Sequence, residues 1–153
     1  MKALARLIAS LWFGSAAFLL AVAAPAAFRA SESPASAANV VGAMLGGWHY
    51  IAVLAPIALL AIEWRRARGF VIAVVFAGVL FAAVEVAIDF RVRAIRAASL
   101  VPISSLSRFD PVRRRFGLLH GISSMALLAQ VFIAAAATIA IERDAAGATD
   151  TTT

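Results

Sequence analysis

Four long apolar stretches constrain the fold of this sequence more than any other feature. They cover residues 7–28, 40–62, 70–88 and 117–141, and Glu85 is the only Asp, Glu, Lys or Arg within them. Each stretch has the roughly 17–25 residues that a helix needs to cross about 30 Å of hydrocarbon. A strand of a membrane barrel alternates apolar and polar residues, which these stretches do not do. The sequence therefore predicts an all-α integral membrane bundle of four transmembrane helices.

The overall composition favours the same class of protein. Hydrophobic residues make up 63% of the 153 residues and charged residues 14%, whereas soluble domains have about 45–50% and roughly 25%. Such a chain has too little polar surface to cover itself in water. We expect one transmembrane domain over residues 1–144 and a disordered polar tail over residues 145–153. The expected location is multi-pass in a membrane, the inner (plasma) membrane of a bacterium.

The first apolar stretch has a second interpretation, a cleaved signal peptide. Lys2 and Arg6 precede the stretch, and small residues from Ala21 to Ala26 could suit a signal peptidase. The apolar region of a signal peptide has about 7–15 residues. Residues 7–28 form a longer uncharged segment, so the sequence favours a retained helix.

The positive charge of the chain indicates lipid rather than nucleic acid as the partner. The net charge is +6, and arginines gather at the ends of apolar stretches, as in WRRAR (64–68) and RRRF (113–116). Arginines at these positions meet lipid phosphates. Lys and Arg divide almost evenly between the two sides, so the charge pattern leaves the orientation open. The sequence has no cysteine, which excludes disulfides and thiol chemistry.

The connections predict antiparallel neighbours, because residues 29–37 and 63–69 form short turns. Asn39 is a candidate cap for the second helix. The longest connection contains RVRAIRAAS (91–99), which is either an extension of the third helix or an amphipathic surface helix. VPISSLSRFDP (101–111) follows it and is turn-like.

Small residues and prolines suggest how the helices pack. Gly42 and Gly46 form a GxxxG pair, a spacing that lets helices approach closely in lipid. Packing inside the bundle is the favoured interpretation of this pair, and a homo-oligomer through Gly42 and Gly46 is the alternative. Pro25 and Pro56 are expected to kink the first and second helices.

Three ionisable residues form a row near the end of the third stretch. Glu85, Asp89 and Arg93 are spaced i, i+4 and i+8, which places them on one face of a helix. Ionisable groups in a membrane span are costly and usually face the bundle interior. One interpretation is a structural ion-pair stack, and the other is a carboxylate pair that handles protons or cations.

His120 lies at a depth similar to that of Glu85, about 5 Å inside the same end of the bundle. We therefore expect His120 to contact Glu85 or Asp89. His49 enters from the same side but lies deeper, at about 13 Å. The cluster is either an interhelical hydrogen-bond network or a ligand or metal site. Its candidate members are Glu85, Asp89, Arg93, His120, Ser123, Ser124 and His49.

Several of these residues carry a resemblance to a known family. FGLLHGISSMALLAQ (116–130) resembles the F-x-x-x-H-G-x-S signature that opens the last helix of the transmembrane protein 205-like family. LWFGSAAFLLAVAAPAAF (11–28) and GAMLGGWHY (42–50) are similar to its first helix and the start of its second. Family members often carry an asparagine after the last-helix serines, where this chain has Ala126 and Leu127, with Gln130 later. The resemblance implies four spans and no assigned enzymatic activity. The eukaryotic member of that family is associated with drug resistance and secretion.

The sequence leaves three functions open. The first is a non-enzymatic membrane protein of the resembled type, in transport or envelope stress tolerance. The second is a small proton- or cation-coupled transporter that uses Glu85 and Asp89. The third is a haem- or metal-binding membrane protein with His49 and His120 as ligands, although their depths differ by about 8 Å. We expect no cofactor, no metal and no enzymatic activity.

Overall fold

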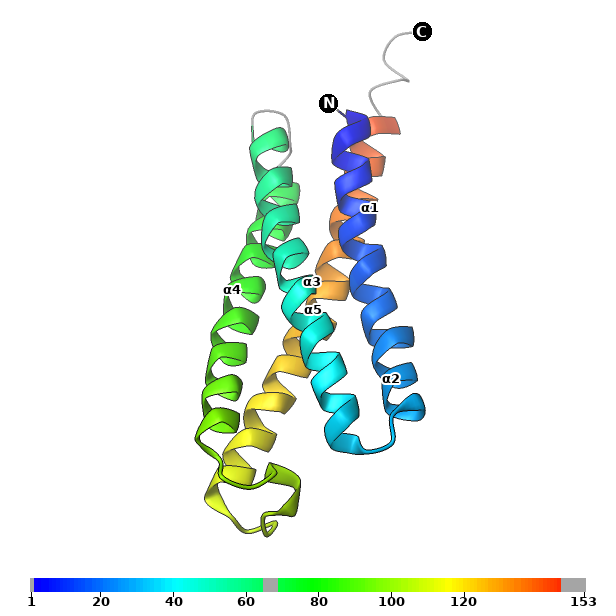
Figure 1. Ribbon diagram of the computed structural model, residues 1–153. Helices are drawn as coiled ribbons and strands as arrows, with labels where there is room; N and C mark the ends of the chain where they lie inside the picture. Colours follow the sequence, from blue (N-terminus) through cyan, green and yellow to red (C-terminus); the bar gives the residue numbers. More distant parts are fainter. Residues whose placement is uncertain (1, 65–68, 147–153) are drawn as a thin grey trace, which may run out of the picture.

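Residues 2–64 and 69–146, the part of the chain that the computed structural model describes, form four long helical rods and no strand (Figure 1). The first rod joins α1 (Lys2–Phe18), the π-helical turn η1 (Leu19–Ala23) and α2 (Ala24–Ala30) without a break. The others are α3 (Pro34–Glu63), α4 (Gly69–Ala98) and α5 (Pro111–Ala146), with a short 3-10 turn, η2 (Ile103–Ser105), before α5. All four rods are long and apolar enough to cross a membrane. The predicted all-α bundle of four helices is confirmed.

Each predicted apolar stretch lies inside one rod, and the rods extend beyond the stretches. Residues 91–98 continue α4, so the first interpretation of RVRAIRAAS, an extension of the third helix, is correct. The predicted turn at 63–69 falls mostly on residues 65–68, outside the described residues. The predicted tail begins within α5, which ends at Ala146, and its remainder also lies outside the described part.

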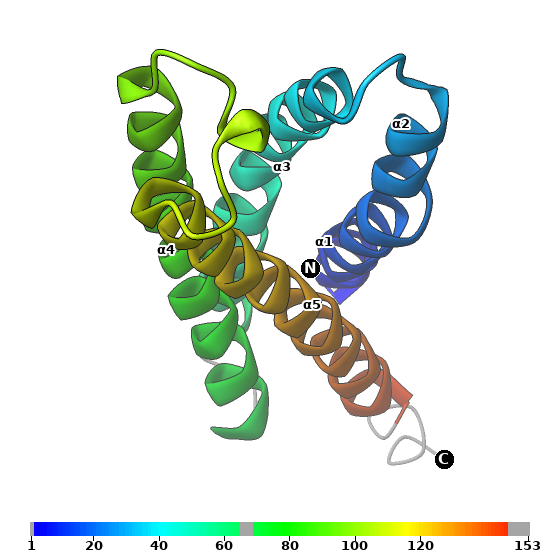
Figure 2. The same cartoon turned by 90° about the horizontal axis from the view of Figure 1, so that it is seen from below.

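The four rods form a ring in which α3 and α5 are the shared neighbours. Both α1 and α4 pack against α3 and against α5. Arg6 near the start of α1 pairs with Glu142 near the end of α5, with Nη2 and Oε2 3.2 Å apart. At the opposite end, α5 lies beside α4, while α3 lies beside α2 (Figures 1 and 2). The helices therefore open at the end that carries the first and third connections.

The middle of the bundle is closed by a contact among α1, α4 and α5. Trp12 and Gln130 are fully buried, and the Gln130 Nε2 donates to the backbone oxygen of Gly78 at 3.1 Å. A Cβ at position 78 would lie 2.9 Å from Trp12 Cζ2 and closer still to Cη2. Gly78 therefore lets the indole of Trp12 lie directly against the backbone of α4.

The first rod changes its hydrogen bonding just before Pro25. Proline has no backbone N–H, so it cannot donate to the carbonyl four residues earlier. In η1 the Ala24 N–H donates to the Leu19 oxygen, five residues back, which is the pattern of a π-turn. The kinks predicted at Pro25 and Pro56 stay predictions. Pro56 is buried inside α3, which runs from Pro34 to Glu63 without interruption.

Side-chain caps set the starts of α3 and α5. The Ser33 Oγ accepts from the Ser36 N–H at 3.1 Å, so the predicted cap at Asn39 is wrong: α3 begins at Pro34, and Asn39 lies within it. The Asp110 Oδ1 accepts from the Val112 N–H at 2.8 Å. Both caps satisfy backbone donors that the first helical turn leaves free.

Candidate functional site

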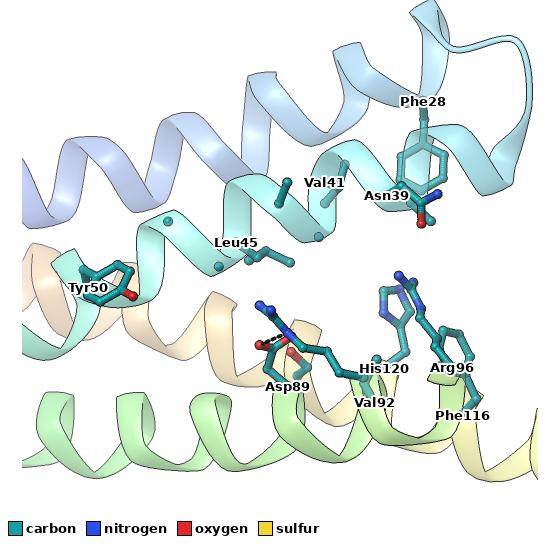
Figure 3. A pocket seen from close by; sticks show the side chains of 17 residues that line it. Phe28, Asn39, Val41, Leu45, Tyr50, Asp89, Val92, Arg96, Phe116 and His120 are labelled. Atoms are coloured by element: carbon teal, nitrogen blue, oxygen red, sulfur yellow. Dashed lines mark hydrogen bonds and ion pairs between the residues drawn. The ribbon is translucent and has the colours of Figure 1, made fainter. Parts of the chain in front are cut away.

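A pocket of about 610 Å³ lies at the open end of the bundle, between α3, α4 and α5, with Phe28 of α2 at its edge (Figure 3). Its lining combines polar side chains with apolar and small ones. The polar members are Asn39, Tyr50, Asp89, Arg93, Arg96, His120 and Ser123. The larger apolar members are Phe28, Val41, Leu45, Val92 and Phe116, and the small ones are Ala38, Gly42, Ala43, Gly46 and Gly47.

Asp89 links α4 to α3 within this pocket. Its Oδ2 accepts from the Arg93 Nε at 2.7 Å, and the Nδ1 of His49 on α3 lies 4.0 Å from the same oxygen. Asp89 and His49 are partly buried, whereas the Arg93 side chain is 60% exposed. The carboxylate of Asp89 therefore offsets the charge of Arg93 and is held in place from two helices.

The GxxxG pair of α3 faces the two pocket arginines. A Cβ at Gly46 would lie 2.8 Å from Arg93 Nη2, and one at Gly42 would lie 3.8 Å from Arg96 Nη1. The absent side chains make room for guanidinium groups from the same chain, in line with the favoured interpretation of packing inside the bundle. The predicted homo-oligomer through Gly42 and Gly46 stays a prediction.

Arg96, Phe116 and His120 form a stacked group between α4 and α5. The Arg96 Cζ lies 5.3 Å from the centroid of the Phe116 ring, within the range of a cation–π interaction. The rings of Phe116 and His120 are nearly parallel, at 7°, with centroids 6.1 Å apart. Arg96 and His120 point across the pocket toward Asn39 and Phe28 (Figure 3).

The predicted contact of His120 with Glu85 or Asp89 is wrong. The Glu85 oxygens accept no hydrogen bond from any described residue, and Asp89 contacts Arg93 and His49. Four residues of an α-helix advance by about 400°, so each member of an i, i+4 row is turned about 40° from the last. Glu85 consequently faces the bundle interior, where it is 2% exposed, while Asp89 lines the pocket.

The structure divides the candidate cluster into a group at the pocket and two residues outside it, Glu85 and Ser124. Asp89, Arg93, His120 and Ser123 line the pocket, and His49 contacts Asp89 from outside the lining. Glu85 lies buried apart from the pocket lining. Ser124 is exposed, and its Oγ donates to the backbone oxygen of His120 at 2.9 Å, so it serves its own helix.

Sequence reasoning missed several residues of the site. Arg96 lies three residues after Arg93 in RVRAIRAAS, and the helical extension of α4 brings both to one pocket. The sequence predicts a cap at Asn39 and places Phe116 in the RRRF segment that meets lipid head groups. A separate polar link was also missed: the Trp48 Nε1 donates to the Ser15 Oγ at 3.2 Å and joins α3 to α1.

The histidines belong to separate groups, because His49 contacts Asp89 and His120 stacks on Phe116. Among residues 2–64 and 69–146, no group of three or more His, Asp or Glu side chains is placed to hold a metal ion. The expectation that the chain binds no haem or metal stays a prediction. Comparisons with protein-family models, curated proteins and solved structures gave no match.

Proposed function

We propose that this chain is a non-enzymatic integral membrane protein whose pocket binds an anionic amphiphile, a carboxylate or phosphate head group on an apolar chain. The proposal rests on the environment of Arg96. This residue lines the pocket and makes no ion pair with any other described residue. Arg93, in contrast, is paired with Asp89. Within the described part of the chain, Arg96 is thus a pocket cation that no carboxylate offsets.

The geometry around Arg96 suits an anionic head group. A guanidinium carries five N–H donors in a planar fork that matches carboxylate and phosphate oxygens. Stacking over Phe116 covers one face of the plane and leaves the donors at its edge available. Asn39 and Ser123 add polar groups to the same pocket.

The rest of the pocket suits an apolar chain. Phe28, Val41 and Leu45 give it an apolar wall on the side of α2 and α3. Its volume of about 610 Å³ falls within the roughly 300–1,000 Å³ of small-molecule sites. A molecule with one charged end and one hydrocarbon end would satisfy both parts of the lining.

The outer surface of the bundle supports the membrane location that the proposal requires. Large apolar side chains on all four rods point outward, among them Leu7, Leu54, Phe76 and Phe132, which are 65%, 61%, 62% and 66% exposed. Soluble monomers rarely expose apolar patches larger than a few hundred Å². Lipid would cover these faces and would also supply the amphiphile.

Binding of an anionic amphiphile would be a physical basis for the transport or stress-tolerance role that we expect for a protein of the transmembrane protein 205-like type. A binding site for amphiphilic anions would let such a protein capture or move a lipid-derived molecule or an amphiphilic toxin. The alternative of a coupling pair formed by Glu85 and Asp89 is less favoured, because Asp89 is occupied by Arg93. The metal alternative would have to bring His49 and His120 together from separate groups.

Native mass spectrometry of the protein in a mild detergent tests the proposal. We expect palmitate and a lysophosphatidic acid to remain bound, and the uncharged monopalmitoylglycerol to bind much less. The first two ligands distinguish a carboxylate head group from a phosphate one. Arg96→Gln should weaken anion binding by roughly tenfold or more, since a charge-assisted hydrogen bond is worth about 1.5–3 kcal/mol.

Arg91→Gln is the matched control, because Arg91 lies on the same helix, is exposed and does not line the pocket. It should leave anion binding unchanged. Equal binding of the uncharged ester and the two anions, or equal weakening by both arginine substitutions, would reject the proposed site.

A further inference from the structure

Glu85 is a buried carboxyl group that the pocket does not use. Its side chain is 2% exposed, and neither of its oxygens has a hydrogen-bond partner among the described residues. A charged carboxylate buried in apolar surroundings is costly unless it is paired. The nearest cations along α4 are Arg91, which is exposed, and Arg93, which lies two turns away and is already bound to Asp89. A proton is therefore the simplest partner for Glu85.

The titratable groups around Glu85 all lie toward the pocket. On α4 these are Asp89, Arg91 and Arg93, about 6, 9 and 12 Å further along the helix axis, and Arg91 is exposed. On α3 they are His49 and Tyr50, and on α5 the nearest is His120. The first rod has no titratable side chain between Arg6 and Arg29. Toward the middle of the bundle, the remaining part of α4 back to Gly69 has none either.

We propose that Glu85 is a proton-binding site and that its proton and the anionic ligand of the pocket bind cooperatively. The proton site stands on the burial of Glu85, and the coupling rests on the proposed function of the pocket. An anion held at Arg96, next to the Arg93–Asp89 pair, would repel a negative charge on Glu85, whereas a protonated Glu85 removes this repulsion. Coupling between two sites is reciprocal, so each ligand would strengthen the binding of the other.

The size of the coupling follows from the spacing along α4. The head group would lie about 12–17 Å from Glu85, measured along the helix from Arg93 and Arg96. At an effective dielectric constant of about 20, two unit charges at that separation change an equilibrium roughly five- to tenfold. The distance along α4 from Glu85 to the head group is only one to two helical turns longer than the distance from Glu85 to Asp89. The two charges can therefore interact through space, without a conformational change.

The proton on Glu85 is tested without any ligand by reaction with dicyclohexylcarbodiimide, an apolar reagent for protonated carboxyl groups in membranes. The carboxylic O–H adds across one C=N bond, and the adduct rearranges to an N-acylurea with no leaving group. We expect one adduct on Glu85 by peptide mass spectrometry, formed more slowly as the pH rises. The adduct should be missing in Glu85→Gln. Labelling of Asp89 instead, or no labelling at any pH, would overturn the proton site.

The coupling is tested with an alkylsulfonate, which stays charged at every pH used. Its affinity for the wild-type protein should fall roughly five- to tenfold as the pH rises and Glu85 loses its proton. Gln mimics the protonated side chain, so Glu85→Gln should fold normally and bind with the affinity of the wild type at low pH, independently of pH. His120→Gln controls for the imidazole in the pocket and should keep the pH dependence.

The outcomes separate the two proposals. Anion binding that depends on Arg96 but has the same pH dependence in Glu85→Gln would overturn the coupling and leave the pocket assignment. A carbodiimide adduct on Glu85 with no anion binding at any pH would reject the pocket and the coupling and leave the proton site.

Discussion

Gly78 lies at a close contact in the bundle, where the Trp12 indole and the Gln130 amide meet one backbone position. Adding a Cβ there would bring it within 2.9 Å of Trp12 Cζ2, so the indole or α4 would have to move. Gly78→Ala should therefore lower the stability by about 1–3 kcal/mol, the usual cost of overpacking, measured by thermal or denaturant unfolding in detergent.

Gly14→Ala is the control for this substitution, because a Cβ at Gly14 has no neighbour within 4 Å. It should leave the stability unchanged or raise it, since alanine is the better helix former. Trp12→Phe should recover part of the loss in a double mutant, because the shorter ring frees the space next to Gly78. Equal effects of the two glycine substitutions would contradict the close contact.

The polar residues show how far a sequence pattern can predict a site. The spacing of Glu85, Asp89 and Arg93 predicted one row, of which Asp89 and Arg93 line the pocket and Glu85 does not. Depth alone placed His120 at the same end of the bundle. Neither the spacing nor the depth predicts how far a helix is rotated about its own axis. In the structure, Glu85 faces inward, Asp89 lies near His49, and His120 stacks on Phe116. The rotation depends on how neighbouring helices pack, and Gly42 and Gly46 make room for Arg96 and Arg93 at this contact.

At the level of elements, hydropathy predicted the existence of the helices better than their ends. An apolar stretch marks the length that suits hydrocarbon, whereas a helix ends where its backbone donors and acceptors find other partners. For α3 and α5 these partners are Ser33 and Asp110. The extra turns matter for function, because Arg93 and Arg96 lie on the part of α4 that extends beyond the apolar stretch.

The connection before α5 is held by one arginine of the RRRF cluster. The Arg113 Nη1 donates to the backbone oxygens of Leu106 and Ser104, the latter at 3.3 Å. Arg113→Ala should loosen this turn and accelerate amide hydrogen exchange at Ser105 and Leu106 by about tenfold, because a hydrogen bond to a charged group contributes about 1.5 kcal/mol or more. Exchange read out by mass spectrometry of the 99–110 peptide measures the effect.

Arg114→Ala removes the same charge from the neighbouring position and serves as the control. Arg114 is exposed, and its side chain makes no hydrogen bond to a described residue. Exchange in the turn should then match that of the wild type. If both substitutions accelerate exchange equally, the cluster acts through its charge alone and the Arg113 contacts do not hold the turn.

At the scale of the whole molecule, the order of the rods fixes which connections share a side. The Arg6–Glu142 pair places the start of the first rod and the end of α5 together, and the rods alternate in direction between them (Figure 1). The first and third connections therefore lie at the same end, where the pocket is. In a membrane, an amphiphile bound at the proposed site would enter the pocket from that side.

Single-cysteine labelling tests this arrangement directly, because the sequence contains no cysteine. Glu32→Cys and Ser104→Cys are exposed positions in the first and third connections, and Arg143→Cys is an exposed position near the end of α5. A membrane-impermeant maleimide applied to sealed vesicles should reach the first two from one side and Arg143→Cys only from the other. Full labelling of all three after detergent lysis controls for reactivity.

Labelling of Glu32→Cys and Ser104→Cys from opposite sides would contradict the alternating rods. A mature chain that begins near Ala27 would contradict the retention of α1. Protection of Ser104→Cys by palmitate would add that the pocket opens on this side, since the third connection borders the α5 end of the site.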